Sequence, residues 1–132
     1  MEQASKKALA AESLELERQA NLKSKYEEFL HLVLESQVRL VDRIAAAMND
    51  RSVPLQAAEI ASAFARKAYA LALLYLDVEL RSLARNYYVA AADLDVLIAR
   101  NHPANELTGA LETWQKTFAA IDEYYFRGDM RA

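Results

Sequence analysis

The stretch VPLQAAEIASAFARKAYALALLYLDVELRSLARNYYVAAADLDVLIAR, residues 53–100, decides the fold class of this chain. Alanine and leucine dominate it, and after Pro54 it contains neither glycine nor proline. Alanine, leucine and arginine are strong helix formers, whereas glycine and proline interrupt helices. The stretch therefore predicts continuous helix, and with it an all-α protein.

Two apolar stripes run along this predicted helix in different registers. The first recurs at heptad spacing and consists of Ala57, Ala61, Phe64, Ala68, Leu71, Tyr75 and Val78. The second lies further along and consists of Tyr69, Leu73, Leu76, Leu80, Leu83, Tyr87, Ala90, Leu94 and Leu97. Where the two stripes overlap, the helix is apolar nearly all round, so neighbours must cover it on several sides.

Two segments with helix-breaking residues, 49–54 and 101–105, divide the chain into helices predicted at residues 2–48, 53–100 and 106–127. Ser52 and Asn105 are the predicted N-caps of the second and third helices, because their side-chain oxygens can accept from free backbone N–H groups. Gly128 is the predicted end of the third helix.

The first and third predicted helices are amphipathic. In the first, the apolar stripe comprises Leu22, Tyr26, Leu30, Val33, Gln37, Leu40, Ile44 and Ala47. Before Leu22 the apolar residues thin out among many charges, so residues 2–25 are predicted to form a projecting helical arm. The third helix has one clean stripe that predicts a core-facing side, formed by Leu107, Leu111, Trp114, Phe118, Ile121 and Tyr125.

Short connections predict a single helical domain over residues 1–132, in which the first two helices form a long antiparallel hairpin. The third helix would fold back beside the N-terminal half of the first, leaving the hairpin tip uncovered. Exposed apolar patches usually mark interfaces, so a homodimer is expected to complete the bundle. The residues predicted for self-association are Phe29, Val33, Leu40, Val41, Ile44, Phe64 and Leu71. The alternative is a monomeric four-helix bundle with the second helix broken near Ser82–Asn86.

Charge and composition exclude several classes of function. The chain has a formal net charge of -3 and no cysteine, so thiolate zinc sites, disulfides and cysteine catalysis are excluded. It has no basic excess for phosphate binding. Its most apolar run is shorter than the roughly 20 residues of a membrane span, and no signal-peptide core is seen. We expect a cytoplasmic protein that needs no cofactor.

One pair of residues has the spacing of a metal motif. Glu28 and His31 form an E-x-x-H pattern, and ferritin-like di-iron bundles use two such pairs together with further glutamates. This chain has one such pair, so a second copy would have to supply the other. We therefore expect no metal, and keep Glu28 and His31 as weak candidates.

By elimination, the leading functional hypothesis is a non-enzymatic helical protein–protein interaction module, such as an adaptor, inhibitor or chaperone-like protein. The residues predicted to bind a protein partner are Leu9, Leu14, Leu16, Arg81, Arg85 and Tyr88. One alternative is a subunit of a nucleoprotein assembly that uses the arginines, including Arg39 and Arg43, to contact phosphate. The other is a helical bundle that binds di-iron or a small ligand.

Overall fold

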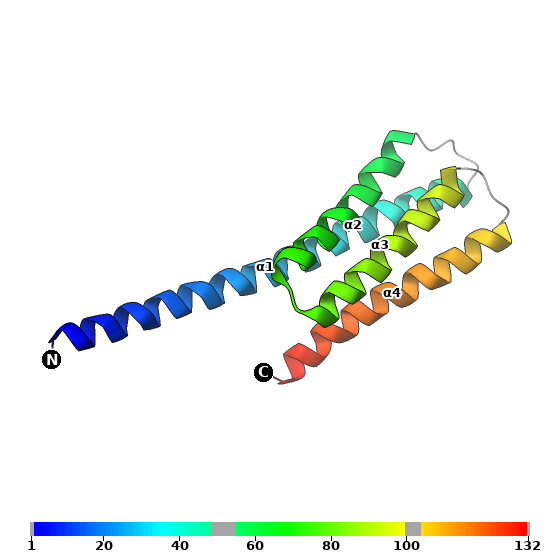
Figure 1. Cartoon of the computed structure of the whole chain (residues 1–132). Coiled ribbons are helices and arrows are strands. Elements are labelled where there is room, and N and C mark those ends of the chain that lie inside the picture. The colour runs from blue at the N-terminus through cyan, green and yellow to red at the C-terminus, as the bar shows by residue number, and fades with distance from the viewer. Residues whose placement is uncertain (1, 49–54, 100–103, 132) are drawn as a thin grey trace.

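The computed structural model describes residues 2–48, 55–99 and 104–131, and within them the side chains of residues 5–46, 62–99 and 106–127. These residues form the helices α1 (Glu2–Met48), α2 (Leu55–Tyr75), α3 (Val78–Ala99) and α4 (Ala104–Arg131). Helix α1 packs along α2, α2 along α3 and α3 along α4, while α1 touches α3 more lightly. Figure 1 shows a helical bundle from which the first half of α1 projects. The all-α prediction is confirmed.

The second predicted helix is broken at Leu76 and Asp77, so the prediction of one continuous helix is wrong, and the chain has the four helices of the alternative. The expected position of the break, residues 82–86, lies inside α3 instead. Asp77 Oδ1 accepts a hydrogen bond from the Leu80 N–H at 2.8 Å, which makes Asp77 the N-cap of α3. Arg81 Nε donates to the Leu76 carbonyl at 2.8 Å. The chain therefore reverses through an aspartate cap, without glycine or proline.

This reversal changes the position of the last helix. Helix α4 was expected beside the N-terminal half of α1, but it packs against α3 because α3 has turned back along α2. At one end, the Tyr125 hydroxyl donates to the Tyr26 carbonyl at 2.7 Å and so links α4 to α1. The first half of α1 projects away from the other helices (Figure 1), and the side chains of residues 5–24 are exposed.

The core is shared by the four helices. Its largest fully buried side chains include Phe29, Leu40, Leu76, Leu80, Tyr87, Leu94 and Ile121. Small buried alanines of α2 and α3, such as Ala72 and Ala91, allow these helices to approach their neighbours closely. The apolar stripe predicted for the last helix faces this core, with Trp114 and Ile121 buried and the rest of the stripe packed against them.

Most of the side chains predicted for self-association are instead buried within this chain. Phe29, Val33, Leu40, Ile44 and Leu71 belong to its own core. The break at Asp77 supplies the fourth helix that the hairpin lacked, so these five side chains are covered within one copy and are not available for self-association. Among the other two residues of that set, Phe64 is half-buried and Val41 is 54 % exposed.

The ends of α4 also differ from the prediction. The helix begins at Ala104, so Asn105 lies inside it, and it continues to Arg131, past the expected end at Gly128. The predicted cap Ser52, with the rest of residues 49–54 and 100–103, lies outside the described residues, as do the side chains of Ala57 and Ala61.

Candidate interaction surface

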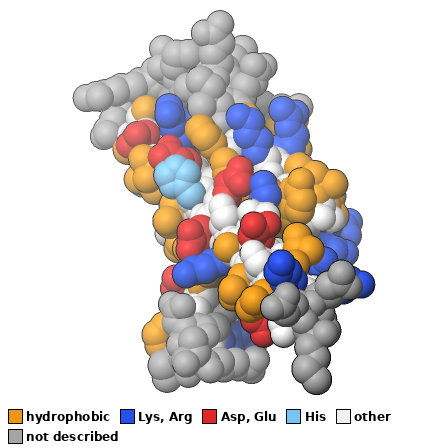
Figure 2. Space-filling model, turned by 90° about the vertical axis from the view of Figure 1, so that its left-hand side faces the viewer, with side chains coloured by type: hydrophobic (Ala, Val, Ile, Leu, Met, Phe, Trp, Pro, Cys, Tyr) orange, Lys and Arg blue, Asp and Glu red, His pale blue; other side chains and the backbone are white. Residues whose placement is uncertain are grey.

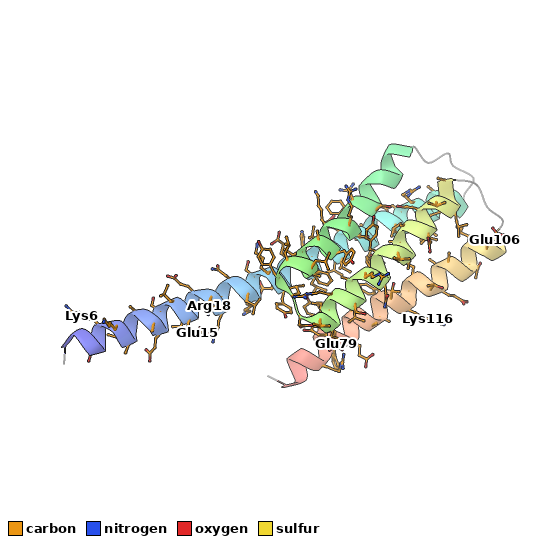
Figure 3. All side chains as sticks on the ribbon, viewed as in Figure 1. Lys6, Glu15, Arg18, Glu79, Glu106 and Lys116 are labelled. Atoms are coloured by element: carbon orange, nitrogen blue, oxygen red, sulfur yellow. The ribbon has the colours of Figure 1, made fainter. Side chains whose placement is uncertain are left out.

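The projecting part of α1 has no covering neighbour. Every side chain from residue 5 to residue 24 is exposed. Figure 3 shows Lys6, Glu15 and Arg18 pointing into open space from this part of the helix, which we call the arm. Within the helix, Glu15 pairs with Arg18 at 3.8 Å and accepts a hydrogen bond from Gln19 at 3.4 Å. Such pairs stabilise a helix by only about 0.2–0.5 kcal/mol each, and a lone helix is marginal in water.

The leucines predicted to bind a partner lie on this arm. Leu9, Leu14 and Leu16 are 64 %, 63 % and 66 % exposed. Leu9 and Leu16 are one heptad apart and therefore share a face, whereas Leu14 lies on a different side of the helix. The arm thus presents an apolar line along one face rather than a patch that includes all three leucines.

A second exposed apolar line lies on the bundle half of α1, and of its residues only Val41 was predicted to take part in an interaction. Leu34, Val38 and Val41 are 45 %, 60 % and 54 % exposed. They lie on the flank of α1 opposite Lys25 and Arg39, whose cationic groups stand over aromatic rings of α2. The flank of α1 that faces away from α2 is therefore apolar and accessible.

The two apolar lines belong to one heptad pattern. Residues at alternating spacings of four and three run along the same face of α1, from the arm into the bundle half. We call this face the α1 seam, and it consists of Leu9, Ser13, Leu16, Ala20, Lys23, Glu27, Leu30, Leu34, Gln37 and Val41. At its centre, Lys23 and Glu27 are exposed and form an ion pair at 4.0 Å. A heptad pattern followed from Leu9 and Leu16 to Leu34 could have found this face, but the core-facing stripe beside it is more continuously apolar.

The predicted arginine surfaces are partly used inside the chain. Arg81 is bound to the Leu76 carbonyl, and Tyr88 packs edge-to-face on Tyr69 with ring centroids 6.0 Å apart, while Arg85 is exposed. Arg43 was expected in an exposed row, but it is buried and forms an ion pair with Asp95. Fewer arginines than expected therefore remain available for phosphate.

The weak metal candidates lie on the surface of α1. Glu28 forms an ion pair with Lys25 at 3.6 Å, and His31 is exposed. Within the described residues, no group of three or more His, Asp or Glu side chains could hold a metal ion.

For the small-ligand alternative, a hollow between α3 and α4 is lined by Ala90, Ala110 and other residues, including Asp93 and Glu106.

A cluster around Asp77, which was not predicted from the sequence, lies where the arm meets the bundle. The Tyr26 hydroxyl donates to Asp77 Oδ2 at 2.9 Å, and the Tyr124 hydroxyl donates to the same atom. Burial, followed by the hydrogen bond and charge of Asp77, raises the pKa of Tyr26 and that of Tyr124. Partial burial alone would raise the pKa of Asp77, but the hydrogen bonds from Tyr124, the Leu80 N–H and Tyr26 lower it. An aspartate inside an apolar run is the signal that marks this position.

No family model, curated protein or solved structure matches this chain. The surface itself is mixed, and Figure 2 shows groups of hydrophobic side chains between Lys, Arg, Asp and Glu on the face seen from the N-terminal side. Among the described residues, no helix combines the length and the apolar character that crossing a membrane requires.

Proposed function

We propose that this chain is a non-enzymatic helical protein–protein interaction module that engages its partner by helix pairing along α1. The observation that carries the proposal is the arm. A run of exposed side chains in one helix includes Leu9 and Leu16 on a single face. Apolar residues at heptad spacing are the pattern by which one helix recognises another.

The rest of the chain supports this proposal because it anchors the base of the arm in the bundle. Phe29, Val33 and Leu40 anchor the bundle half of α1 in the core, and the arm is the same uninterrupted helix. The Asp77 cluster holds Tyr26 at the base of the arm. A partner that docks on the arm therefore meets a helix whose direction is already set, which lowers the entropy lost on binding.

Capture experiments with the full chain test the proposal. The variant with Leu9→Glu and Leu16→Glu places two charges on the apolar face of the arm, where neither side chain contributes to the core. Proteins retained by the wild-type chain should be lost, and rebinding of each purified candidate should weaken at least about tenfold, since burying an unpaired charge is unfavourable.

The control is Leu74→Glu, because Leu74 is 72 % exposed but lies on α2 and not on the apolar face of the arm. This variant should retain the same partners. If the arm variant binds as strongly as the control, the proposal is wrong.

A further inference from the structure

The α1 seam is complementary to itself when it is read in the opposite direction. Residue 25 is the midpoint of α1 (Glu2–Met48), so the arm and the bundle half have nearly equal lengths. If a second α1 lies antiparallel with a two-fold axis level with residue 25, Leu16 faces the partner's Leu34 and Leu9 faces the partner's Val41. In the same arrangement, Ala20 faces the partner's Leu30.

The polar positions of the seam match in the same register. Lys23 faces the partner's Glu27 and Glu27 faces the partner's Lys23, so two pairs of opposite charge meet across the axis. Ser13 faces the partner's Gln37, whose side chain is half-buried in its own chain. Along the seam from Leu9 to Val41, apolar therefore meets apolar and polar meets polar.

From this complementarity we propose that α1 forms an antiparallel homodimer, in which each arm covers the exposed flank of the other copy's bundle half. The proposal rests on the proposed function and names the partner as a second copy of this chain. The arm gains the neighbour that it lacks, and Leu34, Val38 and Val41 lose their contact with water. A two-fold axis makes the interface self-complementary, as closed dimers require.

Other pairings of the seam are unfavourable. Moving the second helix by one heptad sets Leu16 opposite the partner's Glu27 in one direction, and Lys23 opposite the partner's Leu34 in the other. A parallel arrangement sets Lys23 against the partner's Lys23 and Glu27 against the partner's Glu27. Like charges at facing positions disfavour a pairing, so the ionic centre selects both the direction and the register.

A charge-swap cycle tests the proposal by sedimentation equilibrium of the full chain. The wild type should be a dimer of the 14.9 kDa chain. Lys23→Glu alone, and Glu27→Lys alone, should each raise the dimer Kd about tenfold. Each change replaces attraction by repulsion in both of the symmetry-related charge pairs that meet at the two-fold axis. The double variant with both changes should return to within about threefold of the wild type.

The matched control is Arg18→Glu. It makes the same charge change as Lys23→Glu and also breaks an intrahelical pair, at 3.8 Å, but it lies on the opposite side of the arm from the seam. Its dimer Kd should stay within about threefold of the wild type. Circular dichroism of each variant checks that helix content is retained. If the dimer Kd of the double variant is no lower than that of the single variants, the antiparallel pairing is overturned.

The direction of pairing has a direct distance readout. Because the chain has no cysteine, Lys7→Cys creates one attachment point for a spin label on the side of the arm away from the seam. With a rise of 1.5 Å per residue, the labels of an antiparallel dimer should lie at least about 50 Å apart, whereas a parallel pair would place them within about 25 Å. The short distance would overturn the proposal.

The two proposals fail in different ways. A chain that stays monomeric at about 100 μM, which corresponds to a very weak association, overturns the homodimer. If the Leu9→Glu and Leu16→Glu variant then still loses a captured partner, the interaction module stands without self-association. If that variant loses nothing, both proposals are wrong.

Discussion

Arg43 of α1 and Asp95 of α3 form an ion pair in which each residue is only 5 % exposed. The Ser62 hydroxyl of α2 donates a hydrogen bond to the same carboxylate, so three helices meet at this point. Burial lowers the pKa of the Arg43 guanidinium. A buried charge is tolerated when its partner remains, and this pair therefore favours one arrangement of α1, α2 and α3 over its alternatives.

Removing one member of this pair should be costly, and removing both should not. Arg43→Met leaves Asp95 as an unpaired buried charge, so we expect a loss of about 3–5 kcal/mol in the free energy of unfolding. The double variant Arg43→Met with Asp95→Leu should lie within about 1 kcal/mol of the wild type, because apolar packing replaces the pair. Urea unfolding measures both, and equal losses for the single and double variants would contradict this account.

Asp77 should contribute to stability as a helix cap. Asp77→Ala removes the acceptor for the Leu80 N–H and for two tyrosine hydroxyls, so we expect a loss of about 1–2 kcal/mol in urea unfolding. Asp77→Asn keeps an amide oxygen at the same position and should lose clearly less. If Asn is as damaging as Ala, the capping role of Asp77 is wrong.

Asp77 should also make the free energy of unfolding depend on pH in the acid range. The folded chain holds the pKa of Asp77 below its ordinary value, so this contribution is fully present above the unfolded pKa of about 4 and is lost as the pH falls through the folded pKa. The stability difference between wild type and Asp77→Asn should therefore shrink below about pH 4. A difference that is constant from neutral pH into acid would contradict the charge effect.

At alkaline pH, the hydroxyls of the tyrosines around Asp77 should lose their protons at a higher pH than an ordinary tyrosine does. Burial and the nearby Asp77 raise the pKa of Tyr26 and Tyr124, and burial is the main cause for Tyr125. The stability that these hydroxyls provide is fully present below the unfolded pKa of about 10 and is lost as the pH rises through the higher folded pKa. Tyrosinate absorbance of folded and urea-unfolded protein measures this, and superimposable titration curves would refute it.

Two apolar residues of α1 should respond very differently to truncation. Phe29→Ala opens a cavity in the core and should cost about 3–5 kcal/mol of unfolding free energy. Val41→Ala, on the exposed flank, should change the stability of the monomer by less than about 0.5 kcal/mol. Thermal unfolding of dilute protein compares the two variants. Similar losses would mean that Val41 is buried in the folded monomer.

The sequence predicted the helical class and the bounds of α1, because helix formers and heptad spacing persist along that segment without interruption. It did not place the reversal at Asp77. An aspartate is tolerated within helices, and its capping role depends on the bond to Leu80 that forms only after the chain turns. The position of α4 was wrong for the same reason, since it follows from the direction of α3.

The candidate interaction surface was only partly predictable. Leu9 and Leu16 were identified because they are sparse apolar residues among charges, where little else could bury them. Leu34 and Val41 were not recognised as the continuation of the same face, because in α1 the core stripe of Phe29 and its neighbours lies directly beside the seam. Which of two adjacent stripes faces the core depends on the position of α2 and α3, which local spacing does not encode.

Under the proposed function, the uninterrupted backbone of α1 couples partner binding to folding. Since one helix supplies both the docking face and part of the hydrophobic centre, any molecule that holds the arm also protects the bundle against unfolding, and the melting temperature should rise with its concentration. The converse also holds. In the proposed homodimer, a copy whose bundle has unfolded would no longer present half of the α1 seam, so unfolded molecules would be excluded from the dimer.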